Sequence, residues 1–228
     1  NTNTRGVLIN SPNNPSGIVY GDKTLSEMCE IIKEKEVEFG TEIYLVSDEP
    51  YRKIIFDNLE YTHIFNYHNR SIVATSHSKD LALPGERIGY IAVNPDCSDI
   101  EELVDGLVFC NRTLGFVNAP ALIQHLIAHL QDTTIDVRIY EKKRDYLYKE
   151  LTNMGYSLIK PQGAFYMFPK SPIEDDVQFS EELKENRVLV VPGRGFGLPG
   201  YFRISYCMED ATIRGSLEGL EKAISKYR

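Results

Sequence analysis

Short apolar segments that each end at a polar residue recur through the first half of the chain, and this pattern constrains the fold most strongly. Residues 6–10 (GVLIN), 42–47 (EIYLVS) and 71–76 (SIVATS) have the composition of buried strands, and residues 24–39 have the apolar spacing of a helix. A fourth strand is expected at residues 87–93. Strands that alternate with a helical pattern predict an α/β fold with a mostly parallel sheet.

Local signals mark the ends of two predicted helices. Thr24 and Glu27 form a capping-box pattern at the start of the helix 24–39, and Gly40 is placed to end it. Thr133 and Asp136 form a second capping-box pattern.

The second half of the chain changes character. From about residue 100 to residue 151 the pattern is helical, and beyond it strands mix with helices, which predicts a small α+β layer. The strands are expected at residues 164–168, 188–191 and 201–207, and the helices at residues 174–186 and 210–227. We therefore expect a partial large domain over residues 1–120, a connecting long helix over residues 121–150 and a small C-terminal domain over residues 151–228.

The charge balance excludes some classes of function. The chain has 25 Lys and Arg residues against 33 Asp and Glu residues, a net charge of −8, which argues against nucleic-acid binding by this portion and against an anionic membrane surface. No apolar run approaches the length of a membrane span. The four cysteines lack the spacing of a zinc ribbon or a disulfide framework. We therefore expect a reduced, cytoplasmic protein without a metal site.

Polar residues follow three of the predicted strands. Asn14 lies just after the first strand, Asp48 ends the second and Lys79 follows the third, at intervals of roughly 30 residues, the length of one βαβ unit. Because ligands of open parallel sheets bind beyond the carboxyl ends of the strands, we expect an amide, a carboxylate and an amine to face one crevice. Each residue alone is also typical of a turn, a helix cap or a solvated surface.

The neighbours of Lys79 indicate a specific chemistry. Lys79 ends the segment Ser76-His-Ser-Lys79, and Arg87 opens the next predicted strand. Two cations with two hydroxyls suit a bound phosphate or a nucleophilic lysine. A lysine that holds an aldehyde, an acid such as Asp48 that keeps a pyridine nitrogen protonated, and a phosphate-binding cluster are together what pyridoxal-phosphate chemistry requires.

A set of motifs along the chain resembles those of the class I/II aminotransferases, the aspartate-aminotransferase-like group of fold-type I pyridoxal-phosphate enzymes. The motifs are NNPSG (13–17), SDEPY (47–51), SHSK (76–79) with LPGERIGY (83–90), GAFY (163–166), VPG (191–193) with Phe196, and FRIS (202–205). Each motif alone is weak, and the signal lies in their order and spacing over essentially the whole chain. The resemblance implies part of a mostly parallel-sheet large domain followed by an α+β small domain.

For the cofactor, pyridoxal 5′-phosphate, the resemblance implies a role for each matching residue. Lys79 forms the Schiff base and, once released, moves the substrate's α-proton. Asp48 pairs with the pyridine nitrogen, and Tyr51 and Asn14 form hydrogen bonds with the phenolic oxygen. Ser76 and Arg87 hold the phosphate, and Ser78 assists them.

For the substrate, the resemblance implies that Arg203 binds the α-carboxylate, with Asn14 as a second contact. Strand alternation is consistent with this role of Arg203, because it places Arg203 and Ser205 on the face opposite to Phe202 and Ile204.

The resemblance implies amino-group transfer between an amino acid and a 2-oxo acid, by a homodimer in the full-length form. Because the family's chains are longer, we expect this chain to be a C-terminal portion that is weak or inactive alone. Two alternatives stay open, since fold and cofactor do not settle the reaction. One is a C–S β-lyase or a synthase that would use the same Lys79, Asp48 and Arg203. The other is the ligand-sensing domain of a transcription regulator, whose DNA-binding part would precede this chain.

Three further features are assigned no function. His77 departs from the family, which more often has an apolar or aromatic residue at this position. The glycines of the segment 195–200 match the dinucleotide fingerprint, but a strand is expected after them where that motif needs a helix. His125 and His129 share a helix face without an evident third metal ligand.

Overall fold

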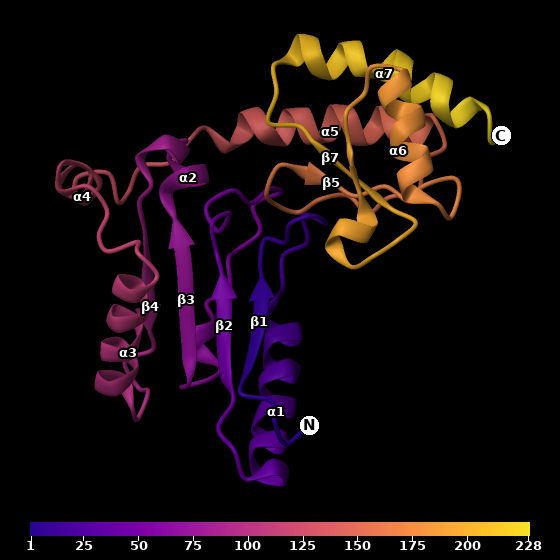
Figure 1. Ribbon diagram of the computed structural model, residues 1–228. Coiled ribbons are helices and arrows are strands. Elements are labelled where there is room, and N and C mark those ends of the chain that lie inside the picture. The colour runs from indigo at the N-terminus through magenta and orange to yellow at the C-terminus, as the bar shows by residue number, and fades with distance from the viewer. The chain divides into compact units, whose positions relative to one another are not determined.

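The computed structural model describes residues 1–228 as two compact units that interleave in the sequence. Unit 1 comprises residues 1–11, 20–53 and 60–135, and unit 2 comprises residues 12–19, 54–59 and 136–228. Figure 1 shows the course of the chain through both units. The domain limits that we expect from the sequence describe continuous segments, and they stay a prediction.

Unit 1 is built on a four-stranded sheet with the strand order β1-β2-β3-β4. The strands β1 (Gly6–Asn10), β2 (Tyr44–Asp48) and β3 (Ser71–Ser76) are parallel, whereas β4 (Gly89–Val93) pairs antiparallel with β3. The mostly parallel α/β fold is thus confirmed, with β4 as an antiparallel exception. The reversal is possible because the connection from β3 to β4 contains no helix long enough to return along the sheet.

The helix α1 (Asp22–Phe39) covers one face of this sheet and supplies part of its core. Leu25, Cys29 and Ile32 of α1 are buried in one apolar cluster with Ile9, Ile43, Leu45, Ile64 and Val73. Full burial of one Leu or Ile side chain stabilises a fold by about 1.5–3 kcal/mol. This cluster therefore holds in place the sheet whose carboxyl-terminal edge carries the polar residues described below.

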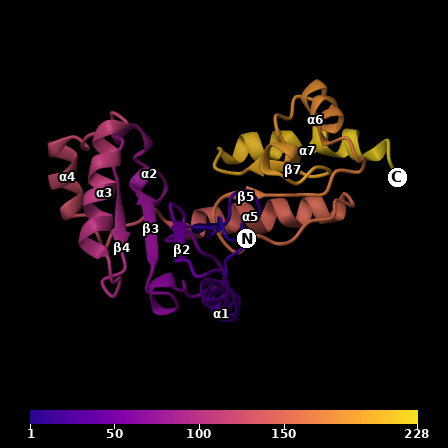
Figure 2. The same ribbon diagram turned by 60° about the horizontal axis from the view of Figure 1, so that its bottom comes forward.

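The opposite face of the sheet carries α3 (Ile100–Thr113) beside β3 and β4. Val73 belongs to the core on the α1 side, whereas Ala74 lines a pocket with Val104 and Val108 of α3, as expected for strand residues that alternate between faces. Figure 2 shows α1 and α3 in this arrangement. The short elements η1 (Ile64–Asn66) and α4 (Ala121–Ala128) complete unit 1 with α2 (His77–Asp80) and η2 (Pro84–Glu86).

The helix ends correct two of the capping predictions. The helix α1 begins at Asp22 after an N-cap at Gly21 that has no side-chain hydrogen bond, so the predicted cap at Thr24 is wrong. Gly40 does end α1 in the left-handed conformation, as predicted. The helix α5 (Val137–Asn153) is capped by Asp136 itself, whose side chain accepts from the Arg138 backbone N–H, rather than by Thr133.

Unit 2 combines a three-stranded antiparallel sheet with three helices, which confirms the α+β character predicted for the last third of the chain. β5 (Tyr166–Met167) and β6 (Val191–Pro192) both pair with the central β7 (Phe202–Ser205). The helices α5, α6 (Asp176–Glu185) and α7 (Asp210–Ser225) surround these strands, with the short η3 (Gly193–Phe196) after β6 (Figure 1). The strands are shorter than predicted by up to three residues at an end.

The core of unit 2 is largely aromatic. Tyr156, Phe179 and Phe202 pack with ring centroids 5.3 to 6.4 Å apart. Leu147 and Leu151 of α5 are also buried in this unit. Aromatic pairs at this spacing contribute about 0.5–1.5 kcal/mol beyond their buried area. Since Phe202 belongs to β7, this packing fixes the strand that carries Arg203.

None of the helices combines the length and the apolar character that crossing a membrane requires.

Candidate functional site

The carboxyl ends of the parallel strands place three predicted residues at one edge of the sheet in unit 1. Asp48 is the last residue of β2, in register with Asn10 of β1 and Ala74 of β3. Ser76 ends β3, and Lys79 follows on the single-turn helix α2. This edge is where open parallel sheets bind their ligands.

Asn10 is a further candidate site residue, which the sequence motifs do not include. Its Nδ2 donates to the backbone oxygen of Asp48 at 2.8 Å and to the Asp48 carboxylate Oδ2 at 3.2 Å. Asn10 therefore orients the carboxylate from the neighbouring strand. The signal was present in the sequence, because Asn10 ends the first apolar segment just as Asp48 ends the second.

The carboxylate of Asp48 lacks a cationic partner. Asp48 is exposed at the end of β2, but partial desolvation by the surrounding protein still raises the pKa of Asp48 above its ordinary value, and no nearby cation opposes this rise. The raised pKa is the response of a carboxylate that has lost part of its water without gaining a counter-charge. A ligand with a positive charge or an N–H donor at this position would supply what is missing.

Lys79 and Ser78 are half-buried on α2, and Ser76 is half-buried at its N-cap. His77 and Asp80, which flank Ser78 and Lys79 on this turn, are buried. One face of this single turn thus lies against the protein, and the other presents an amine and a hydroxyl. Tyr51, three residues beyond the end of β2, is 4% exposed and belongs to the core.

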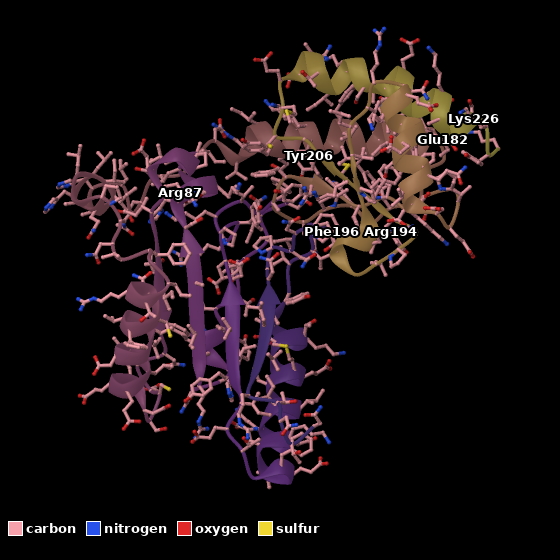
Figure 3. All side chains as sticks on the ribbon, viewed as in Figure 1. Arg87, Glu182, Arg194, Phe196, Tyr206 and Lys226 are labelled. Carbon is pink, nitrogen blue, oxygen red and sulfur yellow. The ribbon has the colours of Figure 1, made fainter.

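Arg87 lies outside β4, which corrects the expectation that it opens the fourth strand. It follows η2 with a left-handed φ of 50°, and β4 begins only at Gly89. The side chain of Arg87, which is labelled in Figure 3, is exposed. Its Nη1 donates to the backbone oxygen of Pro84 at 2.7 Å. A non-glycine residue in this backbone region is uncommon and is often associated with a functional loop.

In unit 2 the structure joins the two residues predicted to bind substrate. Nη1 of Arg203 donates to Oδ1 of Asn14 at 2.8 Å. Arg203 is half-buried on β7, while its neighbours Phe202 and Ile204 are buried, as strand alternation predicts. Asn14 and Arg203 belong to unit 2, and the other predicted residues belong to unit 1.

Two aromatic rings enclose the guanidinium of Arg203. The guanidinium carbon lies 4.5 Å from the ring centroid of Tyr166 and 4.7 Å from that of Phe196, and Figure 3 labels Phe196. Such stacking contributes about 0.5–2 kcal/mol per ring and fixes the plane of the side chain. The buried Nε of Arg203 has no hydrogen-bond partner. The arginine is therefore held in one orientation with a donor unsatisfied.

The loop that carries Asn14 is held within unit 2 by hydrogen bonds to residues 162–163. The N–H groups of Gln162 and Gly163 donate to the Gly17 oxygen at 2.8 and 2.9 Å, and Gln162 Oε1 accepts from the Val19 N–H at 3.1 Å. A small pocket of about 310 Å³ adjoins this loop. It is lined by Asn13, Asn14, Pro15, Ser16, Phe168, Phe196 and Leu198.

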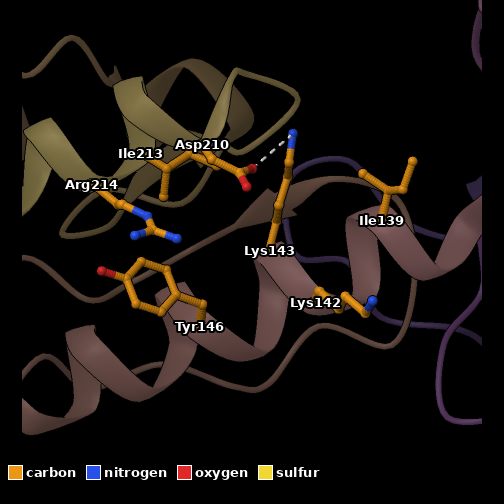
Figure 4. A pocket seen from close by; sticks show the side chains of 7 residues that line it. All are labelled: Ile139, Lys142, Lys143, Tyr146, Asp210, Ile213 and Arg214. Atoms are coloured by element: carbon orange, nitrogen blue, oxygen red, sulfur yellow. Dashed lines mark ion pairs between the residues drawn. The ribbon is translucent and has the colours of Figure 1, made fainter.

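A second pocket in unit 2, of about 400 Å³, is lined by none of the predicted residues. Figure 4 shows it between α5 and α7, where Lys143 pairs with Asp210 at 3.6 Å and Arg214 lies over the Tyr146 ring at 5.8 Å. The Lys143 amine also donates to the Met208 backbone oxygen at 2.5 Å. These contacts connect the two helices.

The segment with the dinucleotide-like glycines folds as a loop. Residues 193–196 form η3, and the chain then turns into β7 without the helix that a phosphate-binding motif requires. His125 and His129 are both exposed. No group of three or more His, Cys, Asp or Glu side chains is arranged to hold a metal ion.

Comparisons with known proteins place these features in a family. The family described as "Aminotransferase class I and II" matches residues 1–220 of the chain. A probable aspartate aminotransferase of Methanocaldococcus jannaschii is 33% identical over 231 residues, which cover 97% of this chain and 58% of the relative.

Solved structures agree with the sequence comparison. The crystal structure of an amino transferase from Eubacterium rectale has a TM-score of 0.96 and 44% identity, and the match covers 100% of this chain and 57% of that one. The aspartate aminotransferase of Thermotoga maritima has a TM-score of 0.81 and 27% identity, with 99% of this chain and 58% of that chain covered.

The chain thus spans less than two thirds of the length of each of these relatives. The family match nevertheless extends over nearly all of it and includes Asp48, Lys79 and Arg203. The chain therefore belongs to the class I and II aminotransferases.

Proposed function

We propose that this chain supplies the lysine, the acid and the carboxylate-binding arginine of a pyridoxal-phosphate-dependent aminotransferase. The reaction is the exchange of an amino group between an amino acid and a 2-oxo acid. The observation that carries the proposal is Arg203, whose guanidinium is fixed between two rings with a buried Nε–H unpaired. A planar, preorganised fork suits a carboxylate, which is the group that amino acids and 2-oxo acids share.

The residues of unit 1 are suited to hold the cofactor. Bound pyridoxal phosphate supplies an electron sink for the substrate's α-carbon. Asp48, whose carboxylate lacks a cationic partner and has a raised pKa from desolvation, suits a protonated pyridine nitrogen. Lys79 offers a primary amine for the cofactor's aldehyde. The hydroxyls of Ser76 and Ser78 and the exposed guanidinium of Arg87 offer donors for the phosphate.

Each of the proposed site residues then has a task that its chemistry permits. The Lys79 amine takes the proton from the substrate α-carbon and returns it, as a general base and acid. Asp48, which Asn10 orients, stabilises the positive charge of the protonated pyridine nitrogen. Arg203 binds and orients the substrate carboxylate, with Asn14 fixing one edge of the guanidinium.

The substrates and the assembly are proposed at the level of the class. The names of similar proteins cover several donors, among them aspartate, aromatic amino acids and N-acetyl-LL-diaminopimelate, so one scaffold accommodates different side chains. We propose an amino acid and a 2-oxo acid as the substrates and a homodimer as the assembly. The cytoplasmic location stays a prediction.

The proposal is tested by Arg203→Lys in the natural full-length protein. Lysine keeps the charge but loses the planar fork, so we expect the KM for the amino acid and for the 2-oxo acid to rise about tenfold or more. The dissociation constant of pyridoxal phosphate should change less than about twofold. Arg214→Lys, on α7 in the same unit, is the matched control and should leave both constants unchanged. Equal weakening of cofactor and substrate by Arg203→Lys would contradict the carboxylate role.

A further inference from the structure

A buried histidine–aspartate pair flanks Lys79 on the same helical turn. His77 is 3% exposed and Asp80 is 5% exposed. The His77 Nδ1 and the Asp80 Oδ2 lie 3.1 Å apart, within hydrogen-bond distance. None of the tasks proposed above uses either residue.

The helix that carries Lys79 has little stability of its own. α2 contains only the four residues His77–Asp80, and its N-cap residue Ser76 makes no side-chain capping bond. Because a first helical turn is costly to form, such a turn keeps its position only through contacts with the rest of the protein. The position of the Lys79 amine therefore depends on whatever holds this turn.

His77 ties the start of the turn to the approach to β4. Its backbone N–H donates to the Ile88 oxygen at 3.1 Å, and its backbone oxygen accepts from the Leu83 N–H at 3.2 Å. The imidazole packs against the Tyr90 ring with centroids 6.1 Å apart. The start of α2 is thus fixed on the side where the chain returns to the sheet.

Asp80 ties the end of the turn to residues 131–135. Its backbone oxygen accepts from the Ile135 N–H at 2.8 Å and from the Thr134 hydroxyl at 3.1 Å. Its Oδ2 lies 3.9 Å from the Lys53 Nζ, which donates to the backbone oxygens of Gln131 and Thr133 at 2.7 and 3.2 Å. Asp80 is thus the point at which α2, Lys53 and the residues before α5 are joined.

The surroundings of the pair contain few other charges. Lys53 faces Asp80, Tyr90 faces His77, and Arg52 donates from Nη2 to the Tyr90 hydroxyl at 2.8 Å. The Asp80 Oδ1 is buried without a hydrogen-bond partner. A buried carboxylate that loses a hydrogen-bond partner is strongly disfavoured. The His77–Asp80 bond therefore stabilises the position of the whole turn.

We propose that His77 and Asp80 are positioning residues for Lys79, which they hold through a side-chain hydrogen bond on the buried face of α2. Residues three apart on a helical turn share a face, so this bond leaves Ser78 and Lys79 on the other face. The inference rests on the proposed function of Lys79, but its geometry concerns this chain's residues alone.

Two substitutions separate the hydrogen bond of His77 from its packing. His77→Phe keeps an aromatic ring against Tyr90 and loses the donor to Asp80. His77→Asn loses the ring and keeps an amide N–H that can reach the carboxylate. A residue that only fills space should tolerate Phe best, whereas a residue that fixes Asp80 should tolerate Asn best.

The experiment uses the natural full-length protein and its two variants. Hydrogen exchange of the peptide that spans residues 76–83 is measured first, in cofactor-free protein. The rate at which the Lys79 amine is modified by trinitrobenzenesulfonate is measured next, by mass spectrometry. We expect His77→Phe to accelerate exchange about tenfold and to change the modification rate, and His77→Asn to stay close to the native protein. With cofactor bound, kcat should fall about tenfold in His77→Phe while KM changes little, because the amine and not the carboxylate site is displaced.

Asp80→Asn and His129→Phe complete the design. Asp80→Asn removes the charge that faces Lys53 and should also accelerate exchange over residues 76–83. This variant tests the proposal independently if His77→Phe fails to fold. His129→Phe, at an exposed position of the same unit, should change nothing. Native-like exchange in both His77→Phe and Asp80→Asn overturns the proposal. Exchange that is closer to native in His77→Phe than in His77→Asn overturns it as well. Absence of transamination by the native protein would instead count against the proposed function, since exchange and amine modification need no cofactor.

Discussion

The Arg203 guanidinium donates through Nη1 to the Asn14 side-chain oxygen at 2.8 Å, across a separation of 189 residues. Asn14 reaches this position because residues 12–19 leave the strand order of unit 1 and pack within unit 2. The bond fixes one edge of a guanidinium whose plane is already set by Tyr166 and Phe196. A carboxylate would therefore meet an arginine that needs little reorganisation.

Asn14→Ala tests that bond. The substitution removes the acceptor of a charge-assisted hydrogen bond, whose loss costs roughly 1.5–3 kcal/mol. We expect the KM for both the amino acid and the 2-oxo acid to rise about tenfold in steady-state kinetics of the natural full-length protein. Asn153→Ala, at an exposed position near the end of α5, is the control. An unchanged KM in Asn14→Ala would mean that Arg203 is held without Asn14.

Gly17→Ala tests how the loop around Asn14 is held. Gly17 has a left-handed φ of 71°, and an added Cβ would lie 2.6 Å from Pro161 Cβ and 2.9 Å from the Gly163 oxygen. We expect the substitution to lower the free energy of unfolding by about 1–3 kcal/mol and to raise the KM in the same direction as Asn14→Ala. Gly215→Ala on α7, where an added Cβ meets no atom within 4 Å, should be neutral or stabilising by up to about 1 kcal/mol. Denaturant unfolding measures both, and similar effects of the two substitutions would contradict the close contact.

The ion pair between Asp57 and Arg144 should make stability depend on pH. Nη1 and Nη2 of the fully buried Arg144 donate to the Asp57 carboxylate at 2.7 and 2.8 Å, and hydrogen bonding to Arg144 lowers the pKa of Asp57. A carboxylate with a lowered folded-state pKa stabilises the fold above its unfolded pKa of about 3.9, and the contribution is lost as the pH falls through the folded pKa.

We therefore expect Asp57→Asn to lower the Tm near neutral pH, and the difference from the native protein to shrink as the pH falls below about 4. Asparagine is suitable because it tolerates the left-handed φ of 58° at this position. Circular dichroism melts at a series of pH values give the measurement, with the exposed Asp105→Asn on α3 as the control. A difference in Tm that is independent of pH would argue against a charge-based role of Asp57.

The sequence predicted the residues whose position follows from strand order. Asp48 ends β2 and Lys79 follows β3. The apolar segments reveal these strands, and parallel strands end at one edge of a sheet. The direction of β4 was missed because an apolar pattern does not encode the direction of a strand. The expectation that Arg87 opens this strand failed for a related reason. The segment 84–87 turns through η2 and a left-handed residue, and only the backbone shows that turn.

Other features depend on contacts between distant segments, which a single sequence does not reveal. The enclosure of Arg203 requires Tyr166 from β5 and Phe196 from η3 both to lie against its guanidinium. The membership of Asn14 in unit 2 depends on its loop packing near Gly163. His77 carried a local signal, as a polar residue where the family more often has an apolar one, but its bond to Asp80 needed the fold of α2 to become visible.

The identity of the lysine that binds pyridoxal phosphate tests the central claim most directly. The natural full-length protein is incubated with the cofactor, reduced with sodium borohydride, digested and mapped by mass spectrometry, with Lys53→Arg and Lys79→Arg as paired variants. We expect a visible absorption band that disappears on reduction, with label on Lys79 in the native protein and in Lys53→Arg, and no label in Lys79→Arg. Label on any other lysine, or no label on the native protein, would contradict it.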